Sequence, residues 1–147
     1  MIFISYASED RSYAQELFKA LKTEGLVPWM DKPPSPHQAE GLQVGQRWQQ
    51  EIERVLNGAD YIILVLSRVS VRKRGFVSYE FRFALDRMNT LPDDATLVLP
   101  VRKDECDVPD MKVKFISLKD LHWEDVPSEA IGDFAQRLRM QIDGSYP

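Results

Sequence analysis

The residues able to do chemistry in this 147-residue chain are mainly carboxylates, hydroxyls and aromatic rings. The one cysteine, Cys106, cannot form an internal disulfide, and with only two histidines the chain is poorly supplied for a zinc cage or a Cys/His nucleophile pair. Open α/β sheets bind ligands beyond the carboxyl ends of their strands. The functional site is therefore expected in the segments that follow three predicted strands, 5–10, 31–48 and 67–80.

Several common catalytic motifs are absent from these segments. No G-x-G-x-x-G follows the first predicted strand and no G-x-x-x-x-G-K-[ST] occurs, which disfavours Rossmann dinucleotide binding and P-loop hydrolysis. A serine hydrolase would need the nucleophile elbow G-x-S-x-G, which is also missing. The third predicted strand ends at Ser67, where a phosphorelay receiver needs an acceptor aspartate, so the chemistry of a receiver is excluded.

Short β-rich runs alternate with helical periods along the chain, a pattern typical of a parallel sheet flanked by helices. The strongest run, Tyr61–Leu66, is apolar throughout and is therefore expected at the centre of the sheet. Pro28 cannot donate a ladder hydrogen bond, so the second strand suits an edge. We predict an α/β, flavodoxin-like single domain with a five-stranded parallel sheet in the order 2-1-3-4-5. The predicted strands are 2–5, 26–30, 61–66, 97–101 and 115–118.

Helices are predicted between these strands from the spacing of their apolar residues. The first is expected to start at Ser8 or Asp10, whose side chains favour helix caps, and to end at Gly25. The last has Ser128 as its expected N-cap. A long loop at 32–45, rich in proline, precedes the second helix, and loops of this length are more often functional or mobile than simple connectors.

The composition limits the classes of partner. Subtracting 23 acidic from 19 basic residues gives a net charge of −4, which argues against direct binding of nucleic acid or an anionic membrane through overall charge. No apolar run approaches the ~20 residues that a membrane span needs, and the N-terminus carries no signal-like leader. We therefore expect a single cytoplasmic domain.

Five segments of the chain, taken in order, resemble the TIR (Toll/interleukin-1 receptor) domain family, particularly its bacterial members. The resemblance covers essentially the whole chain, so residues 1–147 are expected to form one TIR domain. The chain departs from the family in having Phe76 where many members have tryptophan, and in its longer, proline-rich BB loop, the family's term for the loop at 32–45. The segments are Phe3-Ile4-Ser5-Tyr6 with Ser8-Glu9-Asp10, Trp29-Met30-Asp31, Leu42-x-x-Gly45-x-x-Trp48, Leu64-Val65-Leu66-Ser67 and Phe76-x-x-x-Glu80.

The resemblance implies cleavage of NAD, releasing nicotinamide and either ADP-ribose or a cyclic ADP-ribose, with Glu80 as the catalytic residue. Ordinary glycosidases need two carboxylates because an alkoxide leaving group must be protonated. Nicotinamide instead leaves NAD as a neutral base, so one carboxylate can suffice by holding the ribose hydroxyls and stabilising the oxocarbenium charge. The alternative is that Glu80 is a solvated surface residue, the commonest situation for a glutamate.

Further residues are candidates for substrate binding. Phe76 is expected to border the site, where it could stack on nicotinamide or adenine. Ser5 could line the pocket floor or merely end a strand. Asp10 could line the pocket floor or cap a helix, and the cap suits it better. Asp31 could orient the BB loop or touch the substrate.

The remaining candidates lie near the other strand ends. Trp48 has a helical spacing that fits burial in the core, and its position at the exit of the BB loop also makes it a candidate to contact substrate. Arg74 belongs to the basic segment 68–74, which could attract the NAD pyrophosphate, contact a neighbouring subunit, or form a solvated loop. Tyr6 and Ser67 complete the predicted substrate-binding set.

A non-catalytic scaffold is the alternative function, because TIR domains of animal receptors and adaptors act through TIR–TIR contacts without turnover. Bacterial members commonly deplete NAD or make a cyclic signal in anti-phage defence. The resemblance thus implies NAD as a substrate with no other cofactor and no metal, and other TIR domains as partners. Self-association is expected to activate the enzyme, since a long BB loop is costly to order alone. We expect either the N-terminal domain of a longer protein, fused to a sensor or effector, or a stand-alone TIR protein with separate partners.

Overall fold

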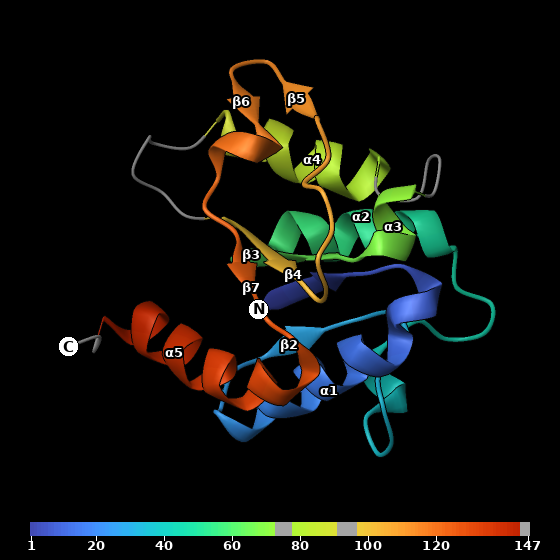
Figure 1. Ribbon diagram of the computed structural model, residues 1–147. Coiled ribbons are helices and arrows are strands. Elements are labelled where there is room, and N and C mark those ends of the chain that lie inside the picture. Colours follow the sequence, from blue (N-terminus) through green and yellow to red (C-terminus); the bar gives the residue numbers. More distant parts are fainter. Residues whose placement is uncertain (73–77, 91–96, 145–147) are drawn as a thin grey trace.

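The computed structural model describes residues 1–72, 78–90 and 97–144, and within these ranges five parallel strands form one sheet with helices on both faces (Figure 1). The strand order is β2-β1-β3-β4-β7. The flavodoxin-like α/β fold is therefore confirmed, including the edge position of the strand that contains Pro28. The strands are β1 (Ile2–Ser5), β2 (Pro28–Trp29), β3 (Tyr61–Leu66), β4 (Val98–Arg102) and β7 (Glu124–Asp125).

The central strand β3 has the predicted bounds and pairs with β1 on one side and β4 on the other. Its register places Ile63 beside Ile4 of β1 and beside Leu99 of β4. All residues of β3 except Tyr61 are buried, as expected for a strand covered on both faces. Because β1 and β3 are parallel, their carboxyl ends lie on the same side of the sheet, and the candidate site residues follow these ends.

The fifth strand of the sheet is not the one predicted from the sequence. Ile116–Ser117 forms β6, which pairs antiparallel with β5 (Lys112–Val113) in a separate hairpin. Its place beside β4 is taken by β7, two acidic residues that an apolar pattern cannot reveal. Asp125 accepts hydrogen bonds from Nε and Nη2 of Arg102 at 2.5 and 2.9 Å, so an ion pair replaces apolar burial at this edge.

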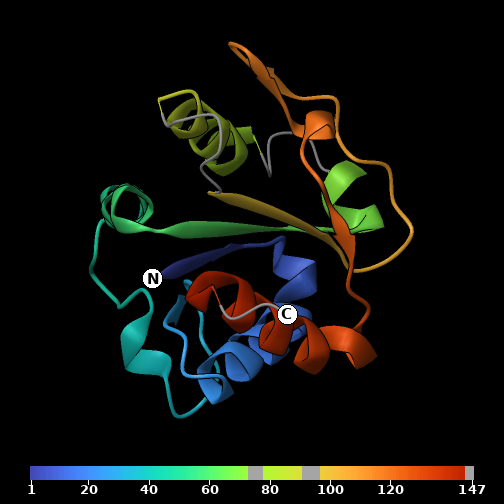
Figure 2. The same ribbon diagram turned by 90° about the vertical axis from the view of Figure 1, so that its left-hand side faces the viewer.

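Helices cover the two faces of the sheet in separate groups (Figure 2). One face carries α1 (Arg11–Thr23) and α5 (Ile131–Asp143), which pack on each other as well as on the sheet. The other face carries α2 (Trp48–Gly58), α3 (Arg68–Arg72) and α4 (Ser78–Met88). The β2 end of the sheet therefore has α1 on one face and α2 on the other.

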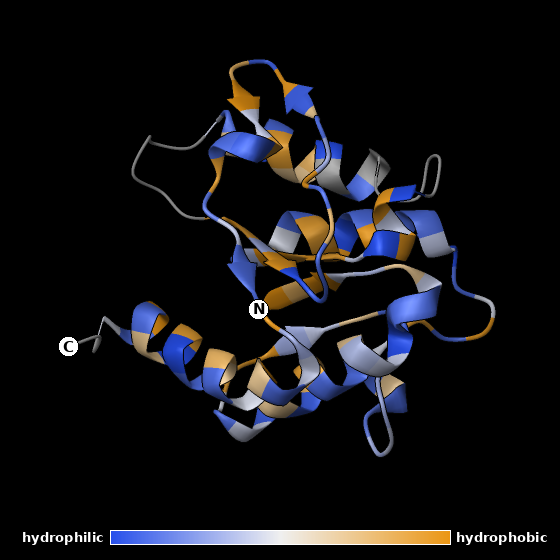
Figure 3. Cartoon of the chain, in the orientation of Figure 1, coloured by the Kyte–Doolittle hydropathy of each residue, from blue (hydrophilic) through white to orange (hydrophobic). Residues whose placement is uncertain are grey.

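The core has two halves because successive residues of a strand point to opposite faces. Phe3 and Leu64 point toward the side of α2 and α4, whereas Ile4 and Ile63 point toward α1 and α5. Figure 3 shows the strongly apolar colouring concentrated on the central strands and on one side of the helices. Each large side chain fully buried here, such as Phe18, contributes ~1.5–3 kcal/mol to folding.

Of the two predicted helix caps, Asp10 is right in position only, and Ser128 is wrong. Ser8–Asp10 forms a 3-10 turn, η1, before α1, and although Asp10 stands at the cap position its side chain makes no capping hydrogen bond. Its carboxylate instead accepts hydrogen bonds from Ser67 and Lys103. Ser128 likewise opens a 3-10 turn, η4 (Ser128–Ala130), and α5 begins after it with Ala130 at the cap position.

Two more 3-10 turns, η2 (Gln38–Glu40) and η3 (Leu118–Asp120), lie in connecting segments, the first of them inside the predicted long loop. Among the helices formed by the described residues, none combines the length and the apolar character required to traverse a bilayer.

Candidate active site

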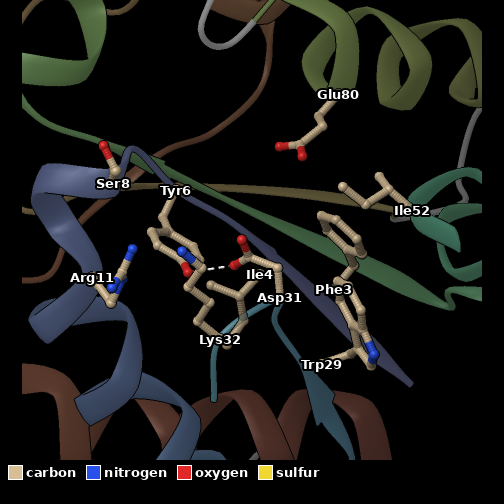
Figure 4. Close-up of a pocket in the computed structure, with 10 residues that line it drawn as sticks. All are labelled: Phe3, Ile4, Tyr6, Ser8, Arg11, Trp29, Asp31, Lys32, Ile52 and Glu80. Atoms are coloured by element: carbon tan, nitrogen blue, oxygen red, sulfur yellow. Dashed lines mark hydrogen bonds between the residues drawn. The ribbon is translucent and has the colours of Figure 1, made fainter. Parts of the chain in front are cut away.

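A cavity of about 270 Å³ lies at the carboxyl ends of β1 and β2, where the sequence analysis places the functional segments (Figure 4). Five structural elements contribute to it: the two strands with the residues that follow them, the start of α1, and side chains from α2 and α4. This is the edge of an open α/β sheet at which ligands generally bind. Its lining divides into a carboxylate group, an apolar wall and a cationic side.

Glu80 enters the cavity from the first turn of α4. The hydroxyl of Ser5, the last residue of β1, donates a hydrogen bond to the Glu80 carboxylate. Ser5 is itself 1% exposed, so its hydroxyl is fixed by the surrounding core. Sequence positions 75 residues apart are thus joined beside the cavity, and the prediction that Ser5 and Glu80 belong to one site agrees with this geometry.

The pKa of Glu80 is raised from 4.5 to about 7; burial is the main cause, the Ser5 hydrogen bond opposes it, and the negative charge of Asp31 adds to the rise. The carboxyl group therefore exchanges its proton near neutral pH. Glu80 is only partly exposed, lines the cavity and is hydrogen-bonded by Ser5, which argues against the alternative of a fully solvated surface glutamate. Strongly perturbed carboxyl groups in a cleft are typical of functional sites.

Asp31 follows β2 and lies in a position compatible with either predicted role, orienting the BB loop or touching the substrate. Its carboxylate lines the cavity and accepts a hydrogen bond from the Tyr6 hydroxyl. Burial, and then the hydrogen bond to Asp31, raise the pKa of Tyr6 far above its usual value, so this phenol remains a proton donor. The backbone carbonyl of Asp31 accepts the Leu42 amide at 2.9 Å and so ties the end of the long loop to its beginning.

The long loop is also held against α1. Glu40 accepts a hydrogen bond from Lys22 of α1 at 2.7 Å, and its other oxygen lies 2.5 Å from Nδ1 of His37. Gly41 passes so close to the Asp31 carbonyl that an added Cβ would lie 2.4 Å from that oxygen. The loop exit therefore requires glycine at this position, and the position of Asp31 depends on it.

Aromatic residues form the apolar wall, although not the aromatic residues chosen from the sequence. The rings of Phe3 and Trp29 stack with centroids 5.2 Å apart, and Ile52 of α2 lines the cavity beside them. Trp48 is 64% exposed and does not line the cavity, so the prediction that it packs in the core is wrong. Phe76, the aromatic residue predicted to border the site, lies outside the described residues.

The cationic side of the cavity consists of Arg11 and Lys32, which the sequence analysis missed. Their positions carried a usable signal, since Lys32 directly follows Asp31 after a strand and Arg11 begins a helix soon after another strand. The basic segment that the sequence highlighted has its described members, Arg68 and Arg72, along a different groove. Arg74 lies outside the described residues.

Ser67 and Asp10 belong to a separate buried cluster and do not line the cavity. The Ser67 hydroxyl donates to Asp10 at 2.6 Å, and the Lys103 ammonium reaches the other Asp10 oxygen at 3.0 Å. The Ser67 hydroxyl also accepts the Ser70 amide, which secures the start of α3. This cluster joins β1, β3 and β4 at their carboxyl ends, and the predicted contact of Ser67 with substrate gains no support from its position.

The arrangement of the cavity suits a ligand with unlike charges at its two ends. The carboxylates of Glu80 and Asp31 can stabilise a developing positive charge, the apolar wall can receive a planar ring, and the cations can bind an anionic group. Among the described residues, no group of three histidine, cysteine or acidic side chains is placed to hold a metal ion.

Comparison with known proteins agrees with this architecture. Residues 2–139 match the family model described as TIR domain. Among solved structures, the chain is similar to a metazoan TIR-STING receptor from C. gigas, determined in complex with 2',3'-cGAMP, with a TM-score of 0.66 and 18% sequence identity. The match covers 92% of this chain and 38% of that receptor, so the chain spans well under half of the receptor's length. No curated protein sequence matches the chain significantly.

Proposed function

The chain belongs to the TIR domain family, and we propose that it cleaves NAD at the bond between nicotinamide and ribose, with Glu80 as the catalytic carboxylate. The observation that carries this proposal is a carboxylate in a cavity, held by the buried Ser5 hydroxyl and with its pKa raised to about 7. Burying such a carboxylate costs folding free energy, and groups of this kind are typical of catalytic sites.

The reaction requires stabilisation of positive charge on the ribose. As the bond from the anomeric carbon to the pyridinium nitrogen breaks, its electron pair goes to that nitrogen, and nicotinamide leaves as a neutral molecule. The ribose then carries the positive charge of an oxocarbenium ion. The negative charge of the ionised Glu80 carboxylate stabilises this positive charge at short range. The cavity is partly desolvated, which strengthens the electrostatic stabilisation.

The other lining residues support the same assignment. The apolar wall of Phe3, Trp29 and Ile52 offers a surface for the nicotinamide ring. Asp31, fixed by the Tyr6 hydroxyl, adds a second negative charge near the ribose. Water completes the reaction by attacking the anomeric carbon and losing a proton, or a group of the bound ADP-ribose attacks it and gives a cyclic product.

Self-association through the BB loop is part of the proposal, and it also supports scaffolding as a second function. Val44 in the loop is fully exposed, and Trp48 at the start of α2 is 64% exposed. Large exposed apolar side chains in one short segment are typical of protein interaction sites. Another TIR domain seated on them would order the loop beside the cavity. We assign the activity to anti-phage defence or signalling in the cytoplasm, together with a fused or separate sensor domain.

The function is tested by incubating the purified chain with NAD across a wide range of protein concentrations and separating the products by chromatography. We expect nicotinamide together with ADP-ribose or a cyclic ADP-ribose. Absence of nicotinamide at every protein concentration, while the chain forms oligomers, would favour the scaffold function instead.

A further inference from the structure

The charges in the cavity are separated, with the carboxylate of Glu80 on one side and the cations Arg11 and Lys32 on the other (Figure 4). Tyr6 and Asp31 lie between the two groups in this view. A ligand that fills the cavity therefore meets negative charge at one end and positive charge at the other. This separation of charge favours a substrate that is positive at one end and negative at the other. A single catalytic carboxylate would select only for the positive end.

Arg11 and Lys32 are exposed at the cavity, where a ligand can reach them. Neither side chain forms an ion pair with another residue in the described part of the chain, and both are exposed to solvent. Arg11 lies close enough to the Tyr6 hydroxyl to influence its pKa. The backbone carbonyl of Lys32 accepts the Gln15 side-chain amide at 3.0 Å, which fixes the start of the loop against α1. Two exposed cations thus line the cavity, and neither forms an ion pair with a residue in the described ranges.

The size of the cavity limits how much of a dinucleotide it can enclose. Its volume of about 270 Å³ lies just below the ~300–1,000 Å³ typical of sites for drug-sized ligands. It is therefore suited to one nucleotide half of NAD rather than to the whole molecule. With the nicotinamide ribose at Glu80, the phosphate on the ribose 5′-carbon extends away from the anomeric carbon, toward Arg11 and Lys32.

We propose that Arg11 and Lys32 bind the phosphate attached to the nicotinamide ribose, so that free nicotinamide mononucleotide is a substrate and nicotinamide riboside is a poor one. This inference rests on the proposed NAD cleavage at Glu80. Hydrolysis breaks the bond between the anomeric carbon and the pyridinium nitrogen, whose electron pair stays on nicotinamide. Water supplies the new hydroxyl of ribose 5-phosphate and releases one proton.

Substrate preference of the wild-type chain gives the first test, with nicotinamide release measured by chromatography at a protein concentration that cleaves NAD. Charge-assisted hydrogen bonds to phosphate favour nicotinamide mononucleotide over the riboside by an expected factor of ~100 in kcat/KM. The mononucleotide should be cleaved within ~10-fold of NAD, because the cavity encloses the half that the two substrates share. Equal kcat/KM for the mononucleotide and the riboside would overturn the inference and leave NAD cleavage intact.

Variants identify the residues responsible. Arg11→Gln and Lys32→Gln should each reduce the preference for mononucleotide over riboside by ~10-fold or more, because each loses a charge-assisted contact. Lys19→Gln is the matched control, since Lys19 is an exposed cation of the same helix α1 but does not line the cavity. An unchanged preference in both cavity variants would refute the assignment of the phosphate site.

Calorimetric titration with nicotinamide mononucleotide and nicotinamide riboside measures binding at the phosphate site independently of catalysis. The Glu80→Gln chain should bind the mononucleotide at least ~10-fold more tightly than the riboside, and Arg11→Gln should remove the difference. If the wild-type chain cleaves nothing but this difference is observed, the proposed reaction fails while the phosphate site stands. If the two ligands bind equally, the phosphate site is wrong whatever the activity.

Discussion

Glu80→Gln should stabilise the fold at alkaline pH, because the glutamine keeps the shape of the side chain and removes its ionisation. Burial raises the pKa of Glu80 in the folded chain from 4.5 to about 7. The folded chain then holds a proton that the unfolded chain has released, and wild-type stability falls as pH rises from about 4.5 through about 7. The pH dependence of folding is therefore predicted to carry a contribution from this one carboxyl group.

The size of this contribution follows from the pKa shift. At about 1.36 kcal/mol per pH unit, the rise from 4.5 to about 7 corresponds to a destabilisation of about 3 kcal/mol once Glu80 is fully ionised. For a chain of this length, that is about 6–12 °C in melting temperature. Glu80→Gln should therefore melt higher than the wild type by about this amount at pH 8.5, and the two should differ by less than about 1 kcal/mol at pH 5.

Chemical denaturation of both proteins at pH 5 and pH 8.5 measures the effect. Glu16→Gln provides the matched control, since Glu16 is exposed on α1 and its replacement should leave the free energy of unfolding nearly unchanged at both pH values. The reasoning would be refuted if the difference between wild type and Glu80→Gln were the same at the two pH values, because burial could not then be raising the pKa.

Three other predictions concern the loop, the buried cluster and assembly. Gly41→Ala should cost about 1–3 kcal/mol and lower activity by displacing Asp31, whereas Gly58→Ala, which meets no neighbour within 4 Å, should stay within about 1 kcal/mol of wild type on thermal denaturation. Lys103→Met should cost about 2–3 kcal/mol in urea denaturation, because it strands the buried Asp10 carboxylate, and an unchanged midpoint would contradict the ion pair. Specific activity should rise with protein concentration, and a constant value for a monomer would count against activation by assembly.

The fold was largely predictable because apolar runs report burial directly. The strands at Ile2–Ser5 and Tyr61–Leu66 were predicted with their observed bounds, since each is buried almost throughout. Pro28 correctly indicated an edge. The fifth strand was not predictable in this way, because Glu124–Asp125 is held at the sheet edge by ion pairs with arginines and has no apolar pattern.

The site was predictable where its chemistry follows strand ends and less so where it depends on side-chain direction. Ser5, Tyr6 and Asp31 were chosen for their positions at or after the ends of β1 and β2, and all three lie at or beside the cavity. Trp48 was misplaced because its helical spacing matches that of buried residues while its position at the first residue of α2 leaves it exposed. Trp29 was overlooked as a wall residue, since stacking on Phe3 depends on pairing between two strands.

Nicotinamide release from NAD by Glu80→Gln, beside wild type and Glu16→Gln, tests the central claim most directly. The assay is run at pH 8, where the wild-type carboxylate is mostly ionised, and at a high protein concentration that permits assembly. The account predicts that Glu80→Gln loses at least about 100-fold in rate, because the charge that stabilises the oxocarbenium ion is gone, while Glu16→Gln keeps wild-type activity. A folded Glu80→Gln chain that releases nicotinamide at the wild-type rate would contradict it.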